Sequence, residues 1–223
     1  MNHFSVLMQF LRDRAQFLEE VRTRRRLEKK NASLLICSCL LFALYGAIMG
    51  SYSGGLQMLA SAAKLPALYL LTLLICLPSL FLFEVISGSK YAFAQYQALL
   101  LVAMSSMGIV LFGFAPISLF FRLSVGDYAF FKLLNVAILA IAGGLGIQIF
   151  YSSAIALREK ESDAPKYRSS ILQSWLLLYA FVGSQLGWTL RPFFGSPGLD
   201  FQLFRSLESN FYAHVFKLIT QGL

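Results

Sequence analysis

The sequence predicts an all-α membrane protein, a polytopic bundle of five transmembrane helices with an amphipathic interfacial helix at each terminus. Five apolar stretches carry almost no charge, and each is close to the about 20 residues that a helix needs to cross a bilayer. Charged residues make up 13% of the 223 residues, whereas soluble domains have about 25%. These two observations exclude most soluble enzymes. The expected spans are Leu34–Tyr52, Ala67–Ile86, Gln97–Phe114, Phe130–Leu157 and Ile171–Leu190.

The segment before the first span has the apolar spacing of an amphipathic helix. Apolar residues recur three or four positions apart from Phe4 to Val21, and a dense basic run follows them. We expect residues 1–32 to form a cytoplasmic helix on the membrane surface, with its cations against anionic lipid headgroups. A docking site for a partner protein is the alternative interpretation. The basic residues of this run are Arg22, Arg24, Arg25, Arg26, Lys29 and Lys30.

Prolines are expected to set the limits of the second and third spans. Residues Leu56–Pro66 are too few to cross a bilayer, so a separate interfacial helix is predicted there, with Lys64 at the headgroups. Pro78 is expected to kink the second span, because a proline leaves one helical carbonyl without its donor. Pro116 is expected to end the third span. Glu84 lies at the end of the second span and is expected to extend its carboxylate to the interface.

Lysine and arginine are distributed unevenly between the two sides of the predicted bundle. With a cytoplasmic N-terminus, five spans place thirteen of these cations on the cytoplasmic side and six on the other. Cytoplasmic loops are enriched in cations, so the N-terminus is predicted inside and the C-terminus outside. Clustering at span ends is a pattern of membrane topology and not of nucleic-acid binding. We expect a bacterial inner-membrane protein with a membrane domain at 33–190 and a non-cytoplasmic aromatic tail at 191–223.

Two small-residue motifs are candidates for close helix packing. Gly46 and Gly50 lie four positions apart in the first span, and Gly183 and Gly187 repeat that spacing in the fifth. Such pairs allow helix backbones to approach closely. We hypothesise that the first and fifth spans touch in the outer leaflet, or that one of them meets a partner helix.

The segment that follows the fifth span is the other candidate contact region. Trp188 suits a membrane interface, and a turn rich in glycine and proline comes shortly after Arg191. An interfacial stop with a tight turn is one interpretation, and an outer-face platform for another protein is the alternative. The residues of this platform are Trp188, Arg191, Pro192, Phe193 and Phe194.

The sequence offers few residues for catalysis or metal binding. The histidines are His3 and His214, both outside the spans, and no zinc-protease, nucleophile-elbow or P-loop motif is present. Cys37, Cys39 and Cys76 fall inside spans and lack metal-ligand spacing, so they are expected to be structural thiols. The middle of the spans lacks the ionisable residues that mark ion-coupled transport. No catalytic residue, cofactor or metal is therefore predicted.

Several short segments of the chain resemble a family of uncharacterised bacterial membrane proteins. Members are often labelled as actin-binding proteins of the WASP-homology-2 type, and Leu27-Glu-Lys-Lys30 mimics that short motif, although here the basic run adjoins a membrane span. The resemblance implies the five-span fold and carries no assigned activity. The layout is also similar to that of the Yip family of trafficking membrane proteins. The matching segments are Gly50-Ser-Tyr-Ser, Lys64-Leu-Pro66, Pro116-Ile, Phe131-Lys-Leu-Leu-Asn-Val136 and Trp188-Thr-Leu-Arg-Pro-Phe-Phe-Gly195.

Two classes of function are compatible with these features. The leading expectation is a non-catalytic accessory, scaffold or assembly subunit that binds another membrane protein or a second copy of itself. The alternative is a small pore or carrier for a neutral or apolar solute or a lipid. A cavity among the second to fourth spans would favour the carrier, and a sealed bundle with one exposed apolar face would favour the scaffold. An intramembrane enzyme is a third, less favoured class.

Overall fold

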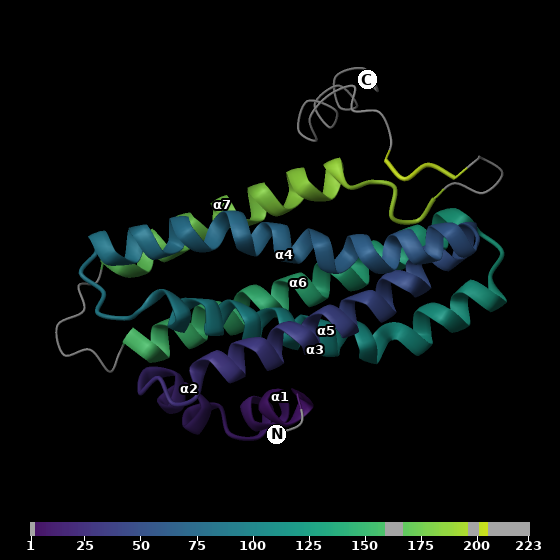
Figure 1. The fold of residues 1–223 in the computed structure, drawn as a ribbon. Coiled ribbons are helices and arrows are strands. Elements are labelled where there is room, and N and C mark those ends of the chain that lie inside the picture. The colour runs from purple at the N-terminus through teal and green to yellow at the C-terminus, as the bar shows by residue number, and fades with distance from the viewer. Residues whose placement is uncertain (1–2, 159–166, 196–200, 205–223) are drawn as a thin grey trace, which may run out of the picture.

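The computed structural model describes residues 3–158, 167–195 and 201–204, and these residues form helices and connecting segments without a strand (Figure 1). The long helices α3 to α7 lie roughly side by side, and the short α1 and α2 pack across one side of the bundle (Figure 1). The elements are α1 (His3–Arg12), α2 (Arg14–Arg22), α3 (Leu27–Gly50), the 3-10 turn η1 (Ser51–Ser53), α4 (Gly55–Ile86), α5 (Phe93–Ser124), α6 (Tyr128–Arg158) and α7 (Tyr167–Thr189).

Within the described residues, four helical segments are long and apolar enough to cross a membrane: α3 with η1, α4, α5 and α6. The predicted all-helical membrane bundle is confirmed in this form. The fifth predicted span corresponds to α7, which has 23 residues and carries more amide and hydroxyl side chains than the other four. α7 is not among the four helical segments that are long and apolar enough, so a fifth membrane crossing stays a prediction.

The proline-based boundaries were wrong. α4 is one helix of 32 residues with both Pro66 and Pro78 inside it, so no separate helix precedes Pro66. α5 likewise continues through Pro116 to Ser124. Membrane helices tolerate proline where neighbouring helices and side chains satisfy the freed backbone groups. The first half of α4 has such a neighbour, because it packs along α3.

α5 is the central helix of the bundle, with α3 on one side and α6 on another. Its residues from Ala98 to Gly108 are all buried. Gly108 faces Leu41 of α3, and the Ser105 hydroxyl donates to the Leu34 carbonyl at 3.0 Å. Asn135 of α6 is fully buried and accepts hydrogen bonds from the hydroxyls of Tyr45 and Ser118. These contacts close the centre of the bundle.

The N-terminal segment forms two helices and not one. Asp13 separates them, and its carboxylate caps α2 by accepting from the Gln16 N–H at 2.9 Å. One apolar face is buried against α3, α5 and α6, so protein covers this part, whereas Phe4, Met8 and Leu11 of the predicted apolar pattern are about half exposed. Arg14 fixes the contact by donating to the hydroxyls of Ser152 and Ser153 on α6. The buried residues of this face are Val6, Leu7, Phe10, Phe17, Leu18 and Val21.

Candidate functional site

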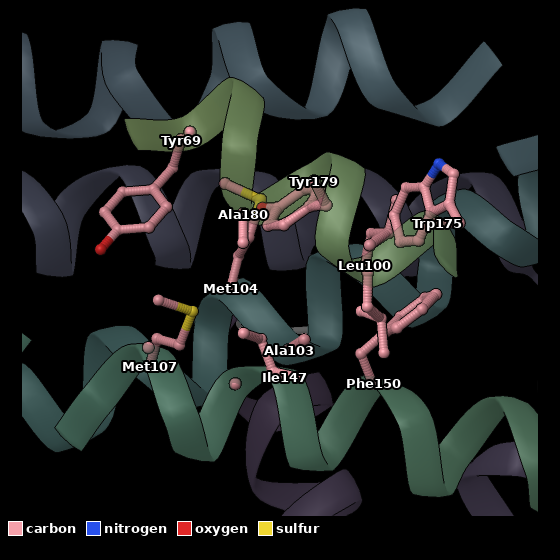
Figure 2. Close-up of a pocket in the computed structure, with 14 residues that line it drawn as sticks. Tyr69, Leu100, Ala103, Met104, Met107, Ile147, Phe150, Trp175, Tyr179 and Ala180 are labelled. Atoms are coloured by element: carbon pink, nitrogen blue, oxygen red, sulfur yellow. The ribbon is translucent and has the colours of Figure 1, made fainter. Parts of the chain in front are cut away.

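A cavity of about 130 Å³ lies between α4, α5, α6 and α7 (Figure 2). Its lining is almost entirely apolar, and the hydroxyls of Tyr69 and Tyr179 are the polar side-chain exceptions beside the Trp175 indole. Small residues on three of the helices leave the space that larger side chains would fill. The lining residues are Tyr69, Leu100, Ala103, Met104, Met107, Gly143, Gly146, Ile147, Phe150, Trp175, Leu176, Tyr179, Ala180 and Gly183.

Aromatic rings form one end and one side of this cavity. Trp175 is 1% exposed, and its indole N–H donates to the Cys76 carbonyl and to the Ser79 hydroxyl of α4, at 3.2 and 3.1 Å. Its only polar atom is thus satisfied outside the cavity. The Trp175 ring lies 5.5 Å from Phe150 and 5.4 Å from Tyr179, measured between centroids. Figure 2 shows Phe150 and Trp175 at one end and Tyr69 with Met107 at the other.

The cavity opens on the side where α6 and α7 meet. These two helices contact each other along little of their length. Ile147 of α6 and Ala180 of α7 both line the cavity and are also exposed at the surface. The opposite side is closed, because Tyr69 stacks on Phe42 of α3 at 4.2 Å between ring centroids. The cavity thus reaches the surface between these two helices.

A buried ion pair joins the ends of three helices near this cavity. Glu84 of α4 is 1% exposed and is paired with the guanidinium of Arg158 at the end of α6. The hydroxyl of Tyr96, on α5, donates to the second carboxylate oxygen at 2.9 Å. Phe150 and Arg158 are eight residues apart on α6, so the pair lies about 12 Å along that helix from the end of the cavity.

This pair corrects the expectation for Glu84. The carboxylate does not extend to the interface, because it is enclosed by α4, α5 and α6 and neutralised by Arg158. Arg158 is part of α6 and buried, although the expected fourth span ended one residue before it, at Leu157. One signal was available, since Glu84 is the single acidic residue between Glu28 and Asp127. A carboxylate alone in apolar sequence indicates a buried partner.

The six basic residues of the N-terminal run occupy different surroundings. Arg22 pairs with Glu19, and Lys30 is buried and pairs with Glu20. Arg24, Arg25, Arg26 and Lys29 are exposed. The run is thus not one uniform surface against the membrane.

The small-residue motifs meet α4. A Cβ atom at Gly46 would overlap the Ser61 carbonyl oxygen, and one at Gly50 would overlap the Gln57 carbonyl oxygen. The α3 motif therefore packs against α4, which replaces the expected contact between the first and fifth spans. On α7, Gly183 lines the cavity, and a Cβ atom there would lie 3.8 Å from Thr72 of α4, while a Cβ at Gly187 would meet open space.

The predicted outer-face segment is held against α4 and α6 by its own backbone carbonyls. Gln57 and Lys64 donate to the Pro192 carbonyl, at 2.9 and 3.2 Å. Ser61 donates to the Phe193 carbonyl. Lys64 is therefore buried beneath this segment, at 5% exposure, and not free at the headgroups.

The remaining carbonyls and charges of this segment are also engaged. The Phe194 carbonyl accepts from Ser53 and the Gly195 carbonyl from Tyr128, at 2.7 and 2.6 Å. The Arg191 guanidinium lies 3.6 Å from the Trp188 ring. The predicted tail helix falls mostly on residues outside the described part of the chain.

Metal-binding chemistry has no assembled donors in the described part of the chain. No group of three or more histidine, cysteine, aspartate and glutamate residues comes together there. Cys37, Cys39 and Cys76 are free thiols. Searches with the sequence and the structure found no matching family model, no matching curated protein and no matching solved structure. The resemblance to uncharacterised bacterial membrane proteins stays a prediction.

Proposed function

We propose that this protein binds the hydrocarbon part of a lipid, or another apolar molecule of the membrane, in the cavity between α4 and α7. The observation that carries the proposal is the apolar cavity that opens between α6 and α7. A ligand enters through that opening directly from the bilayer, without crossing water. This is the carrier class of function for a neutral or apolar solute.

The size and the lining of the cavity agree with this ligand class. An apolar protein cavity of about 150 Å³ stays dry and takes up benzene, and the present cavity is about 130 Å³. It holds one ring or a short length of acyl chain, while the rest of the ligand extends through the opening into lipid. Met104 and Met107 are flexible and polarizable, which lets the walls adapt to ligands of different shape.

The proposal includes the predicted topology. α7 is the fifth crossing, the N-terminus is cytoplasmic and the C-terminus is outside a bacterial inner membrane. The packing of α7 along α4 supports the fifth crossing, and 23 helical residues span about 35 Å, enough for a hydrocarbon core of about 30 Å.

A photoactivatable fatty acid, with a diazirine near the chain end, tests the proposal. The purified protein in mild detergent is irradiated with this probe, and the labelled residues are mapped by mass spectrometry. We expect labels at the lining residues of α6 and α7. Ala180→Phe, placed at the exposed opening, should reduce this labelling several-fold because the ring blocks entry.

Ala137→Phe is the matched control. Ala137 is exposed on α6 and does not line the cavity, so the same added ring should leave the labelling unchanged. Labels spread evenly over the lipid-facing surface, with no effect of Ala180→Phe, would overturn the proposal.

The scaffold function is a second candidate, favoured by one observation. On α1, Phe4, Met8 and Leu11 form an exposed apolar row on the face turned away from the bundle, each about half exposed. We propose that a second membrane protein or the bilayer covers this row. Purification in mild detergent separates the two. Loss of a co-purifying chain in a Met8→Glu variant supports the scaffold, and recovery of the monomer alone from the wild type argues against it.

A further inference from the structure

Part of the basic run lines a discrete pocket of about 400 Å³ between the start of α3 and the start of α5. Arg24, Arg26 and Lys29 supply three positive charges to its walls, and Glu28 supplies one negative charge. Leu27, Ala92 and Ala94 complete the lining. The ion-paired residues of the run, Arg22 and Lys30, are not part of it. The pocket therefore keeps an excess of positive charge.

A buried amide positions one of these cations. Gln95 is 1% exposed and donates to the carbonyls of Val21 and Arg22, at 2.9 and 3.0 Å. Its side-chain oxygen accepts from the Arg24 Nε at 3.3 Å. Gln95 thus ties the turn before α3 to α5 and orients the Arg24 guanidinium at the pocket.

The backbone of the turn is specialised as well. Arg24 and Arg26 have φ values of 55° and 52°, and they are the only described residues other than glycine with positive φ. Side chains other than those of glycine, asparagine and aspartate rarely adopt this conformation. The buried Gln95 contacts hold it in place. Two arginines two positions apart are thereby turned toward one hollow.

The peptide dipoles add to the positive potential of this pocket. Both α3 and α5 begin at its edge, and the N-terminus of a long helix carries a partial positive charge. The N-cap residue of α3, Arg26, forms no side-chain cap hydrogen bond. A planar guanidinium group can donate two parallel hydrogen bonds to two oxygens of one phosphate. An anion with several oxygens therefore matches the donors that surround the pocket.

We propose that this pocket binds a phosphate group, carried either by an anionic lipid headgroup or by a soluble phosphorylated molecule. The site is separate from the apolar cavity and does not depend on the function proposed for it. It assigns a role to three residues of the run, whereas Lys30 joins α3 to α2 through its pair with Glu20.

Two binding measurements on the full-length protein distinguish the two sources. Native mass spectrometry in mild detergent counts bound phosphatidylglycerol against phosphatidylcholine. Thermal unfolding with inorganic phosphate, against chloride at equal ionic strength, detects a soluble ligand. The variant Arg24→Gln/Arg26→Gln should weaken whichever binding occurs by roughly 20-fold, because each cation near an anionic headgroup contributes about fivefold in affinity.

The control variant Arg12→Gln/Arg25→Gln removes the same charge from exposed residues that do not line the pocket. It should change the affinity less than threefold if each residue contributes only long-range screened attraction. Lys29→Gln provides a single substitution at an exposed position if the double variant unfolds. If the pocket variant loses binding of phosphatidylglycerol only, the ligand is a lipid headgroup. If it loses binding of inorganic phosphate only, the ligand is a soluble molecule. Equal loss in pocket and control variants, or no loss in either measurement, would overturn the proposal.

Discussion

Helix α3 packs closely against α4 and α5, and we call this the closed side. Helices α6 and α7 leave a cavity between them, and we call this the open side. On the closed side, Gly46 of α3 contacts the backbone of α4, and Gly108 of α5 contacts Leu41 of α3. On the open side, Gly143 and Ala180 lie around a cavity that reaches the surface. Both sides contain small residues, so residue size alone does not determine whether helices approach.

The difference lies in what each small residue faces. Gly46 and Gly50 face backbone carbonyls of α4, so the two helix axes are drawn close. Gly183 faces the side chain of Thr72 at ordinary contact distance, and the cavity lies beside it. At one end of the cavity, the rings of Phe150 on α6 and Trp175 on α7 pack against each other between the two helices. The closed side is tightly packed, and the open side keeps a cavity of about 130 Å³.

The ion pair of Glu84 and Arg158 should have the largest effect on this arrangement, because it holds the ends of α4 and α6 together beside the open side. Glu84→Ala leaves a buried guanidinium without its main counter-charge. We expect a loss of about 3–5 kcal/mol in stability, measured as reversible unfolding in detergent micelles.

A double variant separates the ion pair from simple packing. Glu84→Met with Arg158→Met replaces both charges by apolar groups of similar length, and such replacements are often nearly neutral. We expect the double variant to regain most of the stability that Glu84→Ala loses. A double variant as unstable as the single one would show that the pair itself is not the cause.

A leucine substitution in each of the two glycine motifs should lower stability on the closed side much more than on the open side. Gly46→Leu must push α4 away, because a backbone carbonyl occupies the space that the side chain needs. We expect a loss of about 3 kcal/mol in the same unfolding measurement. Gly187→Leu is the matched control, since open space surrounds that position and stability should hardly change. Equal losses at both positions would contradict the distinction between the sides.

The sequence predicted helices and their apolar character because these are averages over about 20 neighbouring residues. The predicted boundaries at the prolines were wrong because proline disfavours a helix only locally, whereas contacts with neighbouring helices decide whether the helix continues. Pro66 lies in the half of α4 that packs on α3, beside Ser61 and Leu65, which face Gly46. For the N-terminal helices, the spacing indicated one apolar face, but the structure divides it. Leu7 and Val21 are buried against the bundle, whereas Met8 is half exposed. A pattern cannot tell which apolar residues the rest of the protein covers.

The candidate sites were less predictable than the helices. Glu84 and Arg158 are 74 positions apart, and no local pattern connects them. The cavity is lined by residues of four helices, and small residues on three of them leave its space, so no single segment of the sequence predicts it. The basic run was predicted as a group, and only the fold separates the cations that pair with Glu19 and Glu20 from those that line a pocket. Long-range contacts therefore carry most of the functional information.

The smallest expected effect concerns the attachment of α2 to the closed side. Hydrogen bonding from Lys30 lowers the pKa of Glu20 below its ordinary value of 4.5, assisted by Gln9 and opposed by partial burial. A carboxyl whose pKa is lowered by folding stabilises the fold above its unfolded pKa, and this stabilisation disappears as the pH falls through the folded pKa. The contribution should be about 1 kcal/mol or less, because the pair is partly exposed.

The thermal unfolding difference between the wild type and Glu20→Gln measures this contribution. At pH 7 the variant should unfold at a lower temperature, and the two proteins should converge as the pH falls below the lowered pKa of Glu20. Glu19→Gln is the control, because Glu19 pairs with Arg22 at an exposed position and such pairs contribute little. A Glu20 difference that persists in acid would mean that side-chain shape, and not charge, holds α2 on the bundle. In that case apolar packing, together with the hydrogen bonds from Arg14 to Ser152 and Ser153, holds the N-terminal helices on the bundle.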